Sequence, residues 1–244
     1  MAKPPLVIAV DGPSGAGKSS ASRLLAKRLG WRVFETGGLY RAVAWAVLEA
    51  GVDPQNPSAV GQFCRRLPIR LAPVARPSGG GAATWRILVK ERRLTRQLRE
   101  EPVTTAASIV AAIPAVRARL LTFQRKLLRQ GRVVMEGRDI GTVVCPEAPV
   151  KFFLDAAPSV RGQRRFHEQI ADPAASAQRT LSAIQARDQR DQHRPLAPLQ
   201  AAADAVWIDT TSLTLEQVVD KMMAVLKSRR ILLSSGRLRQ LPHR

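Results

Sequence analysis

The chain has 244 residues, 45% of them apolar, and a formal net charge of +20 at pH 7, from 39 Lys and Arg against 19 Asp and Glu. This length predicts one large or two small domains with a buried core, and the charge favours anionic partners, either nucleic acid or phosphorylated small molecules. Two cysteines exclude a disulfide framework and the lack of a long apolar run excludes a membrane span, so with no signal peptide before the first strand we expect a cytoplasmic protein without a membrane partner.

The first stretch with a chemical meaning is a predicted strand, 6–10, followed by a predicted amphipathic helix, 20–29. Residues 12–19 between them have the pattern Gly-x-x-x-x-Gly-Lys-Ser, a phosphate-binding loop in its strand–loop–helix context. The glycines let backbone N–H groups turn inward, and the helix N-terminus adds partial positive charge. We therefore expect a bound nucleoside triphosphate, with Lys18 at its β- and γ-phosphates and the Ser19 hydroxyl near Mg²⁺. The residues predicted to bind it are Gly12, Pro13, Ser14, Gly15, Ala16, Gly17, Lys18, Ser19 and Ser20.

A second strand is predicted at 31–34, and a helix that passes through 42–48 and ends near Gly51 follows it. Thr36 is a suitable N-cap for this helix. Because α/β folds bind ligands at the carboxyl edge of the sheet, Thr36 and Arg41 lie where a ligand is expected. For Arg41, a phosphate ligand and a solvated helix arginine are both open interpretations.

Residues 67–100 differ from their flanks: two short strands, 68–71 and 85–89, precede a densely charged segment, 90–101, which indicates a small insert outside the parallel sheet. Pro102 begins a helical region that contains Ser108, and Pro114 begins a longer helix whose regularly spaced apolar residues belong to the core. Arg117 lies near the start of that helix, where the helix dipole disfavours a cation. A ligand or partner for Arg117 is one interpretation, and a surface position without function is the other.

The predicted strand 131–136 ends in Glu136, and an acid at this position of a P-loop protein often orders the Mg²⁺ shell. Further strands are predicted at 150–155 and 205–209, an arginine-rich helix after Pro158, a looser segment at 171–183 and a last helix at 213–226. On a helix over 186–194, one face carries Arg187, Arg190, Asp191 and Arg194. That face fits either a ligand site or a mutually paired surface helix.

The alternation of strands and helices predicts an α/β fold with a largely parallel sheet. The motifs then resemble those of bacterial cytidylate kinases, a family of P-loop nucleoside monophosphate kinases. The similar stretches include Asp-Gly-Pro-Ser-Gly-Ala-Gly-Lys at 11–18 and Glu-Gly-Arg-Asp-Ile-Gly-Thr-Val-Val at 136–144, and the others are 36–41, 106–117, 150–156, 187–199 and 202–213.

This resemblance implies a three-layer P-loop NTPase core with a parallel sheet, made of residues 1–35, 108–157 and 188–228. It also implies a nucleoside-monophosphate-binding region at 36–107, a helical lid at 158–187 and a basic tail at 229–244, which we expect to be disordered. The implied reaction is phosphoryl transfer from MgATP to CMP or dCMP. We expect a monomer that does not bind nucleic acid.

The resemblance also implies roles for individual residues. Ser108, Arg117 and Asp139 would meet the cytosine edge, while Arg41, Arg138 and Arg194 would hold the acceptor phosphate. Arg187 and Asp191 would meet the ribose, and Thr36 completes the implied CMP site. The implied catalytic residues are Lys18, Arg138 and Arg194, and Mg²⁺ would lie near Ser19 and Glu136, bound through water.

The chain departs from the family pattern at Ser19-Ser20, at Glu35 before Thr36, at Glu136, and in the insert, where Glu91-Arg-Arg-Leu replaces a more acidic run. Two other functions stay open on the sequence alone. One is a P-loop kinase for another acceptor, such as AMP, UMP or shikimate. The other is a nucleic-acid-stimulated P-loop ATPase, which the net charge and the basic tail suggest.

Overall fold

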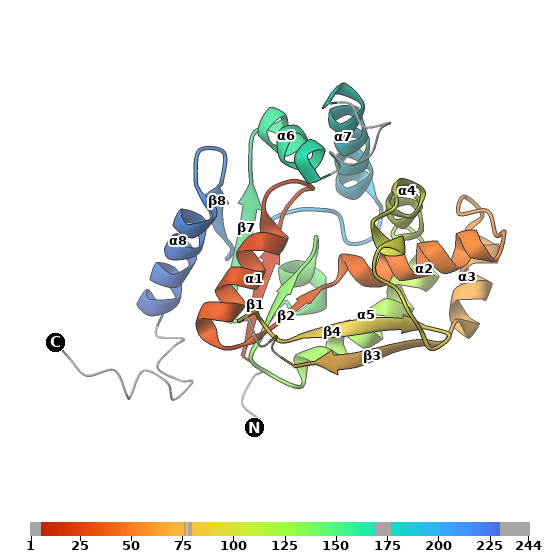
Figure 1. The fold of residues 1–244 in the computed structure, drawn as a ribbon, viewed down its shortest axis with the longest axis horizontal. Coiled ribbons are helices and arrows are strands. Elements are labelled where there is room, and N and C mark those ends of the chain that lie inside the picture. The colour runs from red at the N-terminus through yellow and green to blue at the C-terminus, as the bar shows by residue number, and fades with distance from the viewer. Residues whose placement is uncertain (1–5, 76, 78–79, 169–176, 230–244) are drawn as a thin grey trace.

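The computed structural model describes residues 6–75, 77, 80–168 and 177–229. Its central sheet is parallel, with the strand order β2-β6-β1-β7-β8 (Figure 1). The strands are β1 (Val7–Asp11), β2 (Arg32–Glu35), β6 (Val133–Glu136), β7 (Val150–Asp155) and β8 (Val206–Asp209). The predicted α/β class is thereby confirmed.

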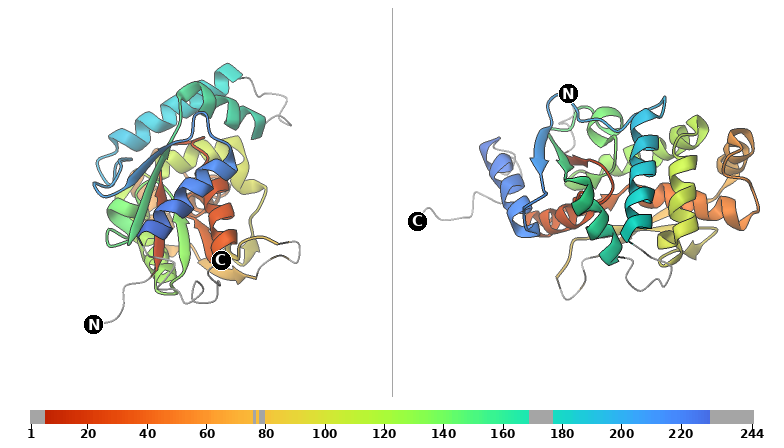
Figure 2. Two further views of the ribbon diagram at one scale, coloured as in Figure 1. Left: turned by 90° about the vertical axis from the view of Figure 1, so that its left-hand side faces the viewer. Right: turned by 90° about the horizontal axis from the view of Figure 1, so that it is seen from above.

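Helices cover both faces of this sheet, so the core has three layers (Figures 1 and 2). Along β1, Ile8 and Val10 pack with α1 (Lys18–Leu29) and α8 (Leu215–Ser228). The alternate residues Val7 and Ala9 belong to the other core cluster, with α2 (Gly37–Glu49), α4 (Glu101–Val110) and α5 (Pro114–Leu128). All four side chains are fully buried, as expected for the middle strand of a doubly covered parallel sheet.

The predicted insert is a separate antiparallel sheet of β3 (Ile69–Val74), β4 (Thr84–Val89) and β5 (Arg92–Arg93). It lies between α3 (Pro57–Arg66) and the short 3₁₀ helix η1 (Gln97–Arg99) along the chain. Trp85 of β4 meets Phe34 of β2 edge-on, with ring centroids 5.7 Å apart. This contact joins the insert to the edge strand of the core.

Two helices, α6 (Pro158–Glu168) and α7 (Ala177–His193), lie side by side above the carboxyl edge of the sheet (Figure 1). Seen from above, α7 lies between α6 and α4 (Figure 2). The prediction of a loose segment through residue 183 was wrong, because α7 begins at Ala177. Most of the surface of α7 is polar, but one short side packs against the protein. On that side Leu181 lies against Gly162, and Ile184 is buried. Residues 171–176 of that segment lie outside the described residues.

A π-helical turn, η2 (Ile140–Val144), follows β6 and was not predicted. The tail expected to be disordered lies almost wholly outside the described residues; Ser228 itself closes α8. Over the part of the chain that is described, no single helix has the length and apolar character to cross a membrane, and the bent pair α4 and α5 meets those criteria by length and composition alone.

Candidate active site

The P-loop has the backbone that its glycines predict. Gly12, Gly15 and Gly17 have φ angles of 143°, 78° and 84°, a region that L side chains rarely adopt. A Cβ on Gly12 would lie 1.9 Å from the carbonyl oxygen of Leu154, so only glycine fits there. The helix α1 begins at Lys18 rather than at the predicted Ser20, which places the helix N-terminus directly at the loop.

Lys18 is buried within this loop, and its Nζ donates a hydrogen bond to the carbonyl oxygen of Pro13 at 2.5 Å. Burial, with a further contribution from the nearby Arg138, lowers the pKa of Lys18 to about 7. An anion bound at the loop would stabilise the charged ammonium form of Lys18, which burial disfavours.

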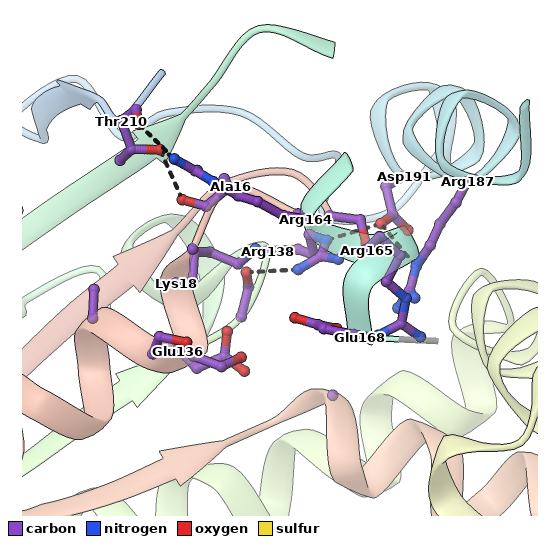
Figure 3. Close-up of a pocket in the computed structure, with 18 of the residues that line it drawn as sticks. Ala16, Lys18, Glu136, Arg138, Arg164, Arg165, Glu168, Arg187, Asp191 and Thr210 are labelled. Atoms are coloured by element: carbon purple, nitrogen blue, oxygen red, sulfur yellow. Dashed lines mark hydrogen bonds and ion pairs between the residues drawn. The ribbon is translucent and has the colours of Figure 1, made fainter. Parts of the chain in front are cut away.

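A cavity of about 690 Å³ opens at the carboxyl edges of β1, β2 and β6, beneath α6 and α7 (Figure 3). It brings together most of the predicted site residues: Ser14, Gly15, Ala16, Gly17, Lys18, Ser19, Ser20, Thr36, Arg41, Ser108, Glu136, Arg138, Asp139, Arg187, Asp191 and Arg194. Three predicted residues do not line its wall: Gly12, Pro13 and Arg117. Ser14 and Arg194, which are 180 positions apart in the chain, thus line the same cavity.

Asp191 organises the basic side of the cavity. Its Oδ2 accepts a hydrogen bond from Arg138 Nε at 2.9 Å and lies 4.0 Å from Arg187 Nε, while its Oδ1 lies 3.8 Å from Arg194 Nη1. These cations hold the pKa of the Asp191 carboxyl below its usual range against the opposing effect of burial. Figure 3 shows Arg138, Arg187 and Asp191 gathered on one side of the pocket, with Lys18 and Glu136 on the other.

Three pocket arginines have buried nitrogens without a hydrogen-bond acceptor in the described part of the chain: Arg41 Nε, Arg187 Nε and Arg194 Nη2. Burial lowers the pKa of all three side chains, that of Arg187 to about 9. Buried polar groups are normally paired, and leaving one unpaired costs roughly 1–3 kcal/mol. Three buried donors without a hydrogen bond in this cavity therefore indicate the binding place of an anion such as a phosphate.

Asp139 lies at the other end of the cavity, between two arginines. Arg117 donates to Asp139 Oδ2, and Arg194 Nη2 lies 3.6 Å from Asp139 Oδ1. Arg117 also donates to the carbonyl oxygen of Ala111 at 3.2 Å, and its guanidinium lies 5.7 Å from the ring centroid of Tyr40. The predicted partner of Arg117 is therefore a carboxylate, and the arginine sits behind Asp139 rather than at the wall.

Ser108 lines the same end of the cavity. Its Oγ donates to the carbonyl oxygen of Thr105 at 2.9 Å and accepts from Arg190 Nε at 3.0 Å. The second bond gives Arg190 a role on the predicted helix face, as a donor to Ser108, although its side chain is exposed. This face is mutually paired, as one interpretation had it, since Asp191 lies 4.0 Å from Arg187 and 3.8 Å from Arg194. It does not face open solvent, however, because Arg187, Asp191 and Arg194 all line the cavity.

Thr36 occupies the N-cap position of α2, but its side chain does not cap the helix. Its Oγ1 instead donates to the carbonyl oxygen of Glu136 at 3.0 Å, and so ties β2 to β6. The capping prediction is wrong because this acceptor on the neighbouring strand is within reach. Both Thr36 and the Glu136 side chain stay at the cavity wall.

Glu136 and Ser19 face the cavity close to Lys18, where the sequence predicts Mg²⁺. Burial raises the pKa of Glu136, with Lys18 acting in the opposite direction. The described residues hold no cluster of three or more His, Cys, Asp or Glu side chains that would form a complete metal site. One carboxylate and one hydroxyl fit Mg²⁺ nonetheless, because this ion keeps several waters and takes the rest of its ligands from substrate phosphates.

Asp11 was not singled out from the sequence. Its two carboxylate oxygens accept hydrogen bonds from the backbone N–H groups of Ile140 and Gly141, at 2.8 and 2.7 Å. Burial raises its pKa to about 7, although both backbone hydrogen bonds favour the charged form. Asp11 precedes the P-loop, and so it fixes η2, and with it Arg138 and Asp139, against the phosphate-binding loop.

Asp188 was also missed. On α7, its Oδ1 accepts from the backbone N–H of Ser14 at 3.2 Å, and its Oδ2 pairs with Arg161 of α6. Arg161 in turn donates to the carbonyl oxygens of Ser14, at 3.1 Å, and Ala156, at 3.0 Å. This buried ion pair, the Asp188–Arg161 clamp, holds both helices to one residue of the P-loop.

A second link joins α6 to the end of the P-loop through Thr210. Arg164 donates to Thr210 Oγ1 at 2.9 Å and to its carbonyl oxygen at 2.7 Å, and Thr210 Oγ1 donates to the carbonyl oxygen of Ala16 at 3.1 Å (Figure 3). Burial lowers the pKa of Arg164. The loop is thus contacted by α6, by α7 and by the segment after β8.

Comparison with known proteins gives a consistent result. Residues 8–228 match the family model described as cytidylate kinase. A cytidylate kinase of Citrifermentans bemidjiense is 42% identical over 225 residues, which is 92% of this chain and 94% of that protein. One from Mycobacterium avium is 42% identical over 226 residues, or 92% and 96% of the two chains. An uncharacterized protein from Eubacterium ventriosum, 10% identical, shares the fold with a TM-score of 0.52 over 91% of this chain and 99% of its own.

Proposed function

The chain belongs to the cytidylate kinase family, and from this membership we propose that it transfers the γ-phosphoryl group of ATP to CMP and dCMP, giving CDP and dCDP. The observation that carries the proposal is the single cavity in which a P-loop faces a cluster of buried arginines. Phosphoryl transfer brings two anionic groups together, and catalysis depends on positioning and on positive charge around them.

The donor half of the site consists of residues 12–20. Backbone N–H groups and the N-terminus of α1 bind the phosphates of ATP. Lys18 stabilises the negative charge of the γ-phosphate during its transfer. Arg138 and Arg194 stabilise the transferred group from the acceptor side, which makes them, with Lys18, the catalytic residues. Mg²⁺ would be held near Ser19 and Glu136, through water, and supplies further neutralisation of phosphate charge when it is bound.

The acceptor phosphate binds to Arg41, Arg138 and Arg194, two of which have unpaired buried donors. Arg187 and Asp191 lie beside them and take the ribose. Thr36 closes this half of the site at the edge of β2. The buried donors that lack a partner in the described protein would gain one from the phosphate, and this gain is a source of binding energy.

The cytosine amino group is a hydrogen-bond donor and needs an acceptor. Asp139 supplies it, with Ser108 near the same edge of the ring. Arg117 acts here through Asp139, which its hydrogen bond holds in one orientation. UMP presents a carbonyl oxygen where CMP has the amino group, so it would leave Asp139 facing another acceptor.

The domain boundaries expected from the family suit this scheme. Residues 36–107 contain the antiparallel insert and form the nucleoside-monophosphate-binding region, and α6 with most of α7 forms the lid over the core. Arg161 of the lid donates to the Ser14 carbonyl oxygen of the P-loop, and Arg164 donates to Thr210, which in turn donates to Ala16 of the loop. We propose a monomer, because every group required by the reaction comes from one chain.

A coupled assay across nucleoside monophosphates tests the function. We expect kcat/KM for CMP and dCMP to exceed that for UMP by about 10²-fold, since an unpaired buried polar group costs roughly 1–3 kcal/mol and 1.4 kcal/mol is tenfold. AMP is rejected by its size. A preference for UMP, AMP or shikimate in the wild-type protein would refute the substrate assignment.

Asp139→Asn tests the base contact itself. The amide can donate as well as accept, so we expect weaker use of CMP and a smaller gap to UMP. Asp220→Asn is the matched control, because it makes the same chemical change in an exposed side chain on α8 that does not line the cavity. If Asp139→Asn keeps the full preference for CMP, the base is recognised by another group.

A further inference from the structure

A second cavity, of about 1030 Å³, lies beside the active site and has no part in the proposed reaction. One wall comes from α1 and β2 of the core, and the other from β4 and the segment 93–99 of the insert. The two cavities share Ser20, Arg41 and Leu215 in their linings, so the second one begins where the active site ends. We call it the basic groove.

The charges that line the basic groove are almost all of one sign. Seven cationic side chains line it, Arg23, Lys27, Arg41, Arg86, Arg93, Arg96 and Arg99, against one acid, Glu35. Glu35 pairs with Arg23, and Arg41 belongs to the proposed acceptor site. The remaining five, Lys27, Arg86, Arg93, Arg96 and Arg99, form no ion pair with any carboxylate of the described residues.

Five unpaired cations that face one another across a groove repel each other and concentrate anions between them. Lys27 comes from the core, and the four arginines come from the insert. An anion bound there would contact both walls at once and offset the repulsion. A single phosphate would engage only part of this set, whereas a chain of phosphates would engage most of it.

The groove offers phosphate contacts but little for bases. Its aromatic side chains, Phe34 and Trp85, are 2% and 6% exposed, and pack against each other. Stacking on exposed aromatic rings is what most single-strand-binding proteins use to hold bases. Recognition in the groove would therefore depend on the phosphate chain and not on base sequence.

We propose that the basic groove is a binding site for a linear chain of phosphates, as found in the backbone of single-stranded nucleic acid or in inorganic polyphosphate. This site is separate from the donor and acceptor sites and goes beyond the proposed kinase activity. The arginine-rich run 92–99 supplies three of the five unpaired cations, Arg93, Arg96 and Arg99, and is its main wall.

The test uses the full chain and a fluorescent twelve-nucleotide oligo-dT, with ADP and CMP at saturation so that the active site is filled. Binding anisotropy is measured from 50 to 200 mM salt. For single strands log K falls by about 0.7 per contacted phosphate for each decade of salt, so five contacts give a slope of about −3.5 and a loss of roughly 100-fold over this range.

Arg93→Gln with Arg96→Gln should lower the slope to about −2, a loss of roughly 20-fold over the same range. Both side chains are exposed and without an ion pair in the described structure, so the variant is expected to fold, which a thermal melt checks. The matched control is Lys126→Gln in the last turn of α5 with Arg129→Gln just after that helix, which removes the same charge outside both cavities. We expect the control to keep the wild-type slope.

Competition with unlabelled inorganic polyphosphate separates the two sources of the ligand. Displacement of oligo-dT shows that the phosphate chain itself suffices, and lack of displacement restricts the site to nucleic acid. Polyphosphate binding without oligo-dT binding restricts it to polyphosphate. The proposal is overturned if neither polymer binds, or if the groove variant and the control lose the same affinity, because the contacts then lie elsewhere.

Discussion

Replacing Asp188 by Asn should lower the free energy of unfolding more than the loss of any single surface charge would. The Asp188–Arg161 clamp is buried, and removal of one partner from a buried ion pair costs about 3–5 kcal/mol, because the other charge stays behind. Asn keeps the size of the side chain and an oxygen for the Ser14 N–H. Asp155 also remains, 3.7 Å from Arg161 Nε. We therefore expect the lower end of that range, about 3 kcal/mol.

For a chain of this size, 1 kcal/mol corresponds to roughly 2–4 °C in Tm, so the expected decrease is about 6–12 °C in a calorimetric melt. Asp220→Asn is again the control. It breaks an exposed pair with Arg28, whose contribution is about 0–1 kcal/mol. If both variants melt within 2 °C of each other, the clamp does not stabilise the fold and the reasoning fails.

A double variant separates stability from function. Arg161→Met with Asp188→Leu removes both charges and replaces them by apolar groups, which is often close to neutral for stability. It also removes both contacts with Ser14. We expect its Tm to return towards the wild-type value while the Kd for ATP, measured by calorimetric titration, stays at least several-fold weaker. Wild-type ATP affinity in the double variant would show that the clamp does not position the P-loop.

The remaining predictions concern the loop, its lysine and the tail. Because burial lowers the pKa of Lys18 to about 7, the side chain is largely neutral above pH 7, and bound phosphates favour its charged form. ATP binding should therefore take up close to one proton at pH 8.5 and weaken as pH rises from 7 to 9, and titrations in buffers of different ionisation enthalpy that detect no uptake would contradict this. Lys18→Ala should abolish the uptake and lower kcat about 10³-fold; a folded variant with near wild-type kcat argues against the P-loop assignment. Truncation after Lys227 should change kcat/KM for CMP less than tenfold, and a soluble but inactive product would place the tail in the active site.

The donor half of the site was predictable because its signal is local. A strand, a glycine pattern and a helix follow one another within 24 residues, from 6 to 29, and each confirms the others. The limits of α1 were wrong by two residues, since the helix includes Lys18 itself. The acceptor half came from matching motifs to a family, because nothing in the spacing of Arg41, Arg138 and Arg194 says that they meet.

Asp11 and Asp188 escaped prediction for a physical reason. Each carboxylate accepts hydrogen bonds from backbone N–H groups that are 129 to 174 residues away in the chain. A backbone N–H donor is the same whatever the side chain, so no sequence pattern shows which donors will pair with an acid. The helix α7 was shortened in prediction for a related reason, since its buried side is only a few residues wide and the rest is polar.

The hydrogen bonds of Asp11 affect how the active site responds to heating. The donor loop leaves β1 and the acceptor turn leaves β6, which are neighbours in the sheet, so their starting points are about 4.8 Å apart. Asp11 fastens the two together in the most buried layer of the molecule. We therefore expect that heating which loosens α6 and α7 admits water to the cavity before it disturbs this spacing. The expected result is hydrolysis of ATP by water while the two substrate sites keep their distance.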